Sequence, residues 1–262
     1  MTTPDSLRTE LESLAGYLEE PFHRAEGVAK LLADPAAQRL LAGGDTTARE
    51  LLGFLRQSPD PAAARVAVLL ATASGSDSAY GELLDILGGA DRRLVLAFDT
   101  GLWRAPRGED AIARDIVRVV ENSGNPEPLI LLQRPRAAAA VKPRLRDLVR
   151  SRIIRFAEYA MSALASAVTA DDIPFLTETA DGTDRPGLSS EAGIALLRLG
   201  SRAGWRGIEA GLAANDEERR VTTFAALRPL LPEELQHNPG FDPHAPTGSQ
   251  PDALARLRNA WD

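Results

Sequence analysis

Apolar residues recur along the chain with the spacing of α-helices. Between residues 6 and 18 the apolar positions Leu7, Leu11, Leu14 and Leu18 step by 4, 3 and 4 residues, which places them on one face of a helix. Ala- and Leu-rich segments with the same period continue to the C-terminal region, and no convincing period-2 run of β-branched and aromatic residues interrupts them. The pattern predicts an all-α fold.

Start and stop signals divide this pattern into short helices. Asp60 before Pro61 predicts an N-cap followed by proline at the first helical position. Thr169 with Asp172 predicts a capping box, and Asn215 is expected to cap a later helix. The predicted helices cover residues 6–18, 25–33, 35–42, 47–57, 80–87, 92–103, 109–121 and 127–132, with further helices after residues 60, 135, 172, 189, 215 and 251.

The onsets of these helices suggest a repeating unit. Onsets at Asp60, Asp91, Asn125, Ser151 and Ser189 lie 31, 34, 26 and 38 residues apart. These spacings are close to the length of a helical-hairpin repeat, although they vary from one repeat to the next. They predict about five stacked hairpins of unequal length.

The segments PAAARVAVLLATASGSDSAYGELLDIL and SSEAGIALLRLGSRAGWRGIEAGL resemble HEAT repeats, and the tail PGFDPHAPTGSQPDALARLRNAWD resembles an ending that follows such repeats in bacterial proteins. The resemblance implies a right-handed α-solenoid that binds other macromolecules, without implying a reaction. We expect an N-terminal helical cap over residues 1–58, HEAT-like repeats over 59–231, and a linker with a C-terminal helix over 232–262. This last helix is expected to pack on the solenoid through Phe241 and Trp261, forming one domain with it.

Composition and charge limit the kinds of site, ligand and cellular location that we expect for the protein. The chain has no cysteine, a net charge of −7 and a pI near 5.2, so disulfides and Cys-ligated metals are excluded and general affinity for polyanions is disfavoured. The N-terminus lacks a basic segment followed by an apolar run, and the longest apolar run, residues 66–71, is too short to cross a bilayer. We expect a soluble, cytoplasmic protein with no membrane partner.

One strongly basic segment stands out in this acidic chain. Residues 134–155 contain eight cations and one acid, Asp147, a local charge of +7 that leaves −14 for the remainder. Arginines could meet an acidic protein or phosphates, since a guanidinium pairs bidentately with either. The alternative is that they pair with acids of neighbouring repeats in the same chain.

Helical geometry restricts how the arginines of this segment can act together. On one unbroken helix, Leu145, Val149, Ile153, Phe156 and Ala160 would share the core face. Arg144 and Arg155 would then flank that face on one side, and Arg146 and Arg150 on the other. A helix break near Arg150 and Ser151, with Ser151 as N-cap, would be needed to bring the arginines to one surface.

Other candidate chemistry in the sequence is sparse. Trp103 beside Arg104 and Arg107 could stack on a nucleic-acid base or anchor the core. The histidines His23, His237 and His244 lack the spacing of metal ligands, and the acid pairs 19–20, 171–172 and 233–234 lie at predicted helix ends. No Walker, GxSxG, HExxH or dinucleotide motif is present.

These observations predict a non-catalytic scaffold that binds another protein, and they indicate no catalytic residue, metal or cofactor. The expected partner-binding residues are Arg144, Arg146, Arg150, Arg152, Arg155, Trp103 and Arg107. Binding of nucleic acid through residues 134–155 is an alternative. A HEAT-like lyase or DNA glycosylase is another, although no aspartate can be singled out as its catalytic residue.

Overall fold

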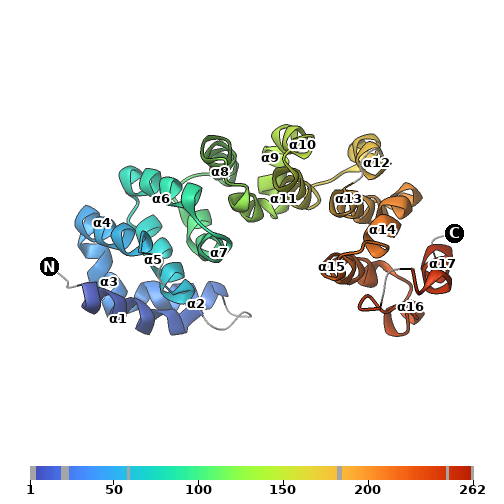
Figure 1. Cartoon of the computed structure of the whole chain (residues 1–262). Helices are drawn as coiled ribbons and strands as arrows, with labels where there is room; N and C mark the ends of the chain where they lie inside the picture. The colour runs from blue at the N-terminus through green and yellow to red at the C-terminus, as the bar shows by residue number, and fades with distance from the viewer. Residues whose placement is uncertain (1–3, 19–23, 58–59, 182–184, 246–247, 261–262) are drawn as a thin grey trace. The chain divides into compact units, whose positions relative to one another are not determined.

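The structure is a computed structural model that describes residues 4–18, 24–57, 60–181, 185–245 and 248–260 (Figure 1). Every regular element in these ranges is an α- or 3-10 helix, which confirms the all-α prediction. Over the same ranges, no helix is both long enough and apolar enough to span a membrane. The chain divides into two compact units, residues 1–141 and 142–262. The boundaries predicted after residues 58 and 231 remain predictions.

The first unit is built from short helices joined by tight turns. Its α-helices are α1 (Pro4–Ala15), α2 (Arg24–Ala33), α3 (Pro35–Ala42), α4 (Gly44–Leu55), α5 (Pro61–Ala73), α6 (Asp77–Gly89), α7 (Arg92–Gly101), α8 (Glu109–Ser123) and α9 (Pro135–Ala140). Its 3-10 helices include η1 (Gly16–Leu18), η3 (Leu102–Arg104) and η4 (Glu127–Leu132).

The second unit continues the same architecture. Its α-helices are α10 (Lys142–Val149), α11 (Ile154–Leu164), α12 (Ile173–Asp181), α13 (Pro186–Arg198), α14 (Trp205–Leu212), α15 (Glu217–Leu227), α16 (Glu233–His237) and α17 (Pro251–Asn259). Its 3-10 helices are η5 (Ala170–Asp172), η6 (Arg202–Gly204) and η7 (Arg228–Leu230).

Helix α5 forms the centre of the first unit, where it contacts α1, α4 and α7. Its residues 66–72 are all buried, as expected for a helix that is apolar on every side. Gly101 at the end of α7 packs directly on this helix, because a Cβ at Gly101 would lie 2.7 Å from the backbone nitrogen of Leu69. The hydroxyl of Thr72 donates a hydrogen bond to the carbonyl of Gly101 at 3.2 Å. Small residues therefore set the close approach of α5 and α7.

The second unit is organised around α13 and α14, which also meet through glycines. A Cβ on Gly193 of α13 would lie 3.0 Å from the backbone nitrogen of Ile208 on α14 and would overlap the carbonyl oxygen of Gly204, the residue before α14. The adjoining core extends from Trp205 and Leu212 to Leu257 of α17. In this core the rings of Phe224 and Phe241 lie 5.3 Å apart. The final helix thus packs on the helices before it, while Trp261 lies outside the described residues.

Several predicted helix caps are confirmed. The Asp60 carboxylate accepts a hydrogen bond from the Ala62 N–H at 2.9 Å, and Thr169 with Asp172 forms the predicted capping box. The prediction for Asn215 is wrong, because the neighbouring Asp216 caps α15 by accepting from the Glu218 N–H at 3.1 Å.

The predicted helix onset at Ser189 is also wrong. Helix α13 already starts at Pro186, so Ser189 lies inside the helix and is buried. Proline fixes the backbone dihedral φ near the helical value and donates no N–H, which suits the first helical position.

Candidate functional site

The basic segment contains a helix break near Arg150 and Ser151, the place where a shared arginine surface would need one. Helix α10 ends at Val149 and α11 starts at Ile154, so residues 150–153 form a turn. The prediction of Ser151 as N-cap is wrong, because Ile153 occupies that position. The hydroxyl of Ser151 instead accepts a hydrogen bond from the N–H of Ile153 at 3.2 Å. Such a local hydrogen bond stabilises the turn, and the N-cap of α11 lies two residues after the predicted one.

The break also changes which residues face the core. Leu145, Val149 and Ala160 are buried as predicted. The prediction for Ile153 is wrong, since it is 60% exposed, and Phe156 is only partly buried. Because the four turn residues leave helical geometry, the apolar face of α10 does not continue in register into α11.

Two cations of the segment bind one buried acid. Nζ of Lys142 lies 2.8 Å from Oδ2 of Asp172, and the guanidinium of Arg146 contacts Oδ1 of the same carboxylate. The side chain of Asp172 is fully buried. Its Oδ2 also accepts hydrogen bonds from the N–H and hydroxyl of Thr169, at 2.7 and 3.1 Å. This carboxylate therefore joins α10 to the start of α12.

The pKa of Asp172 reflects this environment. Burial by itself would raise the pKa, because it disfavours the charged form. Hydrogen bonds from Lys142, Arg146 and Thr169 to the carboxylate outweigh burial and lower the pKa to about 2. Asp172 is consequently ionised at neutral pH and offsets charge on both cations.

Arg146 and Arg150 also flank an aromatic ring. Their guanidinium carbons lie 5.7 and 5.1 Å from the centroid of Phe175 on α12, within the range of cation–π attraction. Arg150 additionally lies 3.5 Å from Glu178. Both arginines therefore face α12 of their own unit.

Three further cations of the segment have acidic neighbours. Within the first unit, Arg134 pairs with Asp99 at 3.1 Å and Arg136 pairs with Asp110 at 3.4 Å. Within the second unit, the Arg144 guanidinium lies 3.3 Å from Asp147, three residues further along α10. Together with Lys142, Arg146 and Arg150, at least six of the eight cations have an acid partner. The local charge of +7 is thus largely offset within the chain.

The remaining part of the segment presents an apolar pair to solvent. Ile153 and Ile154 are 60% and 52% exposed. Of the large hydrophobic side chains in the described residues, only Tyr17 and Leu96 are exposed as well. Arg152 and Arg155, which adjoin the pair in sequence, are also exposed. We call residues 150–155 the basic turn.

Arg185 holds the basic turn in place. Its Nη1 donates to the carbonyl of Ser151 at 3.0 Å, and its Nη2 donates to the carbonyl of Arg152 at 3.2 Å. Two nitrogens of one planar guanidinium thus fix two successive peptide groups. The exposed isoleucines are therefore carried by a turn that the N-terminal end of α13 anchors.

Trp103 and Arg107 lie in the first unit and have different neighbours. The guanidinium of Arg134 lies 5.0 Å from the Trp103 ring centroid, while Arg107 lies 4.4 Å from the ring of Tyr80 and pairs with Asp77. Each arginine therefore stacks on an aromatic ring of the chain itself. The indole N–H of Trp103 is buried without a hydrogen-bond partner.

The histidines have ordinary polar contacts. Nδ1 of His237 lies 2.9 Å from the carbonyl of Glu233, and Nδ1 of His244 lies 2.7 Å from Glu217. His23 lies outside the described residues, as does the acid pair 19–20. Within the parts of the chain that the structure describes, no cluster of three or more His, Cys, Asp or Glu residues could hold a metal ion.

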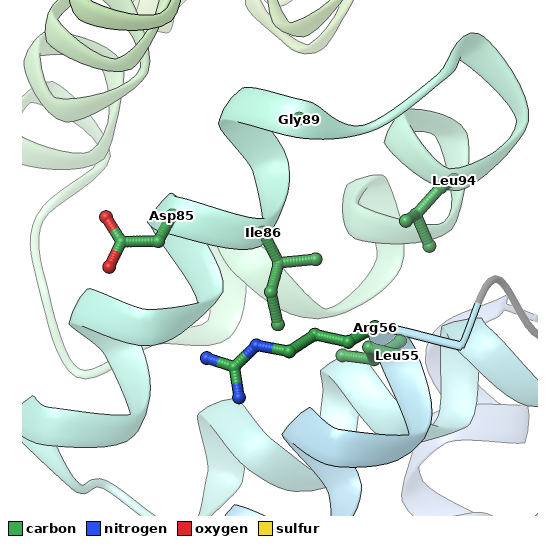
Figure 2. Close-up of a pocket in the computed structure, with 6 residues that line it drawn as sticks. All are labelled: Leu55, Arg56, Asp85, Ile86, Gly89 and Leu94. Atoms are coloured by element: carbon green, nitrogen blue, oxygen red, sulfur yellow. The ribbon is translucent and has the colours of Figure 1, made fainter.

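A surface hollow of about 310 Å³ in the first unit offers little chemistry. Leu55, Ile86 and Leu94 line it together with Arg56, Asp85 and Gly89. Figure 2 shows the Arg56 side chain extending beneath Ile86, and its guanidinium is paired with Glu82 at 2.7 Å. The Asp85 carboxylate turns away from Arg56 and Ile86 in Figure 2, so the charged groups of the hollow do not converge as they do in a ligand site.

Glu191 on α13 is an unusual group that the sequence did not single out. Its Oε2 is buried without a hydrogen-bond partner. Burial, followed by the nearby carboxylate of Glu158, raises the pKa of Glu191 to about 8 against the weaker effects of Arg219 and Arg198. Glu158 itself pairs with Arg219 of α15 at 3.1 Å. Since these residues come from three helices, no local sequence signal could have shown the cluster.

The basic turn is thus the candidate site that the geometry isolates. Comparison of the chain with models of known protein families gives no match, and comparison with curated protein sequences gives no significant match.

Proposed function

We propose that this chain is a non-catalytic, HEAT-like helical-repeat scaffold that binds another protein through the basic turn. The observation that carries the proposal is the exposed pair Ile153–Ile154 beside exposed arginines. Adjacent apolar side chains exposed on an otherwise polar surface are a feature of protein-binding sites.

The packing order of the helices supports a repeat architecture. Within each unit most helix contacts join an element to the next one or the next but one, as in α4 with α5, α5 with α7, α12 with α13 and α13 with α14. Nearest-neighbour packing of this kind is typical of α-solenoids. The right-handed solenoid and its kinship to HEAT repeats form part of the proposal.

The ion pairs favour a protein partner over nucleic acid. A phosphate binder needs cations that are available to the backbone of the nucleic acid. At least six of the eight cations in residues 134–155 instead have acid partners within the chain, and the Trp103 ring is stacked with Arg134. The basic turn exposes apolar side chains beside its arginines. Such a mixed surface fits a protein partner better than a phosphate backbone.

The test is a comparison of affinity purifications from native host cells. The full-length chain and the double variant Ile153→Ser with Ile154→Ser are purified in parallel, and the captured material is analysed by mass spectrometry and by nucleic-acid staining. We expect at least one protein that the wild type enriches and the double variant loses. Leu96→Ser, at an exposed leucine on α7 of the first unit, should retain it.

Two results would contradict the proposal. One is a set of captured proteins that is the same for the wild type and the double variant. The other is capture of nucleic acid with an affinity that falls steeply and linearly with log salt, the behaviour of phosphate contacts.

A further inference from the structure

We propose that the basic turn receives a short acidic segment of the partner, in which aliphatic or aromatic side chains cover Ile153 and Ile154 while a carboxylate pairs with Arg152. This inference rests on the proposed function and adds the chemistry of the partner. It follows from three properties of the turn, namely its apolar pair, its charge and its anchored backbone.

The apolar pair requires apolar contact from the partner. Ile153 and Ile154 expose more than half of their surface, and covering such side chains removes apolar area from water. Because only these two large apolar side chains of the turn are exposed, the contact area is small and fits one or two side chains of the partner. A short segment of the partner is therefore sufficient to cover it.

The charge of the turn selects acidic neighbours in that segment. Arg152 is exposed and has no acidic partner among the described residues, in contrast to Arg144, Arg146 and Arg150. No acid lies in the first turn of α11, and no side chain caps its N-terminal end. A carboxylate beside Arg152 would gain a charge-assisted hydrogen bond. A lysine at the same place would meet like charge.

The same charge disfavours a second copy of the chain in this position. A two-fold contact through the isoleucines would bring the exposed arginines of two turns together. Like charges placed opposite one another in an interface are destabilising. The partner is therefore a different surface, and its acidity complements the turn.

The anchored backbone makes the turn a preformed receptor. Because Arg185 bonds to the carbonyls of Ser151 and Arg152, the turn is ordered before a partner arrives. Preorganisation of this kind reduces the entropy lost on binding. A small contact can then bind with measurable affinity.

The test is an unbiased selection followed by a charge swap. A phage library of random 12-residue peptides is selected on the immobilised full-length chain, and enrichment is compared with the same selection on the double variant Ile153→Ser with Ile154→Ser. We expect peptides that depend on the isoleucines and combine Asp or Glu with Leu, Ile, Phe or Trp. Leu96→Ser and Arg104→Glu, at exposed residues of the first unit, serve as matched controls and should leave enrichment unchanged.

The enriched peptide is then synthesised and titrated by fluorescence anisotropy. Arg152→Glu should weaken its binding by about tenfold or more, the typical loss for a central interface residue. A peptide with Lys in place of its acids should bind Arg152→Glu better than it binds the wild type. This reversal would show a charge contact, which a loss caused by misfolding could not imitate.

The outcomes separate this inference from the proposed function. If the turn-dependent peptides are basic, or if no peptide depends on the isoleucines, the acidic-segment inference is wrong. In either of these two cases, the proposed scaffold function would still be supported by a protein that the wild type captures from host cells and the double variant does not. Displacement of the peptide by a single-stranded oligonucleotide, with the salt dependence of phosphate contacts, would instead overturn both in favour of nucleic acid.

Discussion

Nζ of Lys142 lies 2.8 Å from Oδ2 of Asp172, a carboxylate that is fully buried and also contacts Arg146. Lys142 and Arg146 of the basic segment 134–155 therefore stabilise the fold of the second unit, independently of any partner. Most arginines of residues 134–155 likewise pair with acids of the chain, whereas Arg152 of the basic turn is exposed without an acid partner among the described residues.

Asp172→Asn should destabilise the second unit. The substitution removes a negative charge while leaving Lys142 and Arg146 close together, so their repulsion is no longer offset. Breaking a buried ion pair costs about 3–5 kcal/mol, and we expect roughly 2–4 kcal/mol here because both cations are partly exposed. Urea unfolding monitored by circular dichroism measures the loss. The neighbouring exposed acid offers a control, Asp171→Asn, which should stay within about 0.5 kcal/mol of the wild type.

The same carboxylate should make the unit sensitive to acid. The pKa of Asp172 is about 2 in the folded chain, below its ordinary value of 3.8, so its contribution is present above pH 4 and is lost as the pH falls toward 2. Unfolding at pH 7, 4 and 2.5 should show a smaller difference between wild type and Asp172→Asn at the lowest pH. An equal difference at all three values would contradict the assigned pKa.

Glu191→Gln should stabilise the chain in mildly basic solution. The pKa of Glu191 is about 8 when folded and 4.5 ordinarily, so the folded state holds a proton that the unfolded state releases between these values. Wild-type stability contributed by this group is therefore highest below pH 4.5 and falls as the pH rises toward 8. The variant Glu191→Gln has no titrating carboxyl at this position, so it should not show this decrease in stability.

The measurement is chemical denaturation of wild type and Glu191→Gln at pH 5, 6.5 and 8. The advantage of the variant should widen with pH and reach a few kcal/mol at pH 8. Glu234→Gln, at an exposed glutamate of α16, provides the control and should show no such trend. A constant difference would mean that Glu191 is ionised in the folded chain throughout this range.

Arg185→Ala should loosen the basic turn without unfolding the unit. The carbonyls of Ser151 and Arg152 lose their donors, each hydrogen bond to a charged group being worth about 1.5–3 kcal/mol. Hydrogen exchange measured by mass spectrometry should speed up in a peptide spanning residues 150–157. Arg206→Ala removes an exposed arginine whose contact with Asp181 is 3.7 Å, and exchange in the turn should be unchanged in that variant.

Gly193→Ala and Gly81→Ala should have opposite effects. A methyl group at Gly193 would overlap the carbonyl oxygen of Gly204, whereas one at Gly81 in α6 meets nothing within 4 Å. We expect the first to destabilise by about 2–3 kcal/mol through overpacking. The second should stabilise by about 0.5–1 kcal/mol because alanine favours helices over glycine. Denaturant midpoints of the two variants test this directly.

The fold class was predictable because local signals carry it. The helical period around Leu11 and the caps at Asp60 and Thr169 depend on residues within a few positions of one another. Ile153 was misassigned to the core because a single break shifts the apolar face, and periodicity alone does not show its new direction.

The site was less predictable because its contacts are distant in sequence. Lys142 meets Asp172 across 30 residues, and Arg219 meets Glu158 across 61. Charge counting found the basic segment, but it could not show which arginines the chain neutralises itself. The exposure of Ile154 followed only from the three-dimensional arrangement.

The two bonds from Arg185 link recognition to folding. The basic turn keeps its shape only while α13 is folded, so a partner that binds the ordered turn must favour the folded state of the second unit. By mass action, a partner present at a hundred times its dissociation constant would add about 2.7 kcal/mol to that stability. The melting temperature of the second unit is therefore itself a reporter of partner binding, and it can be read without a label on either molecule.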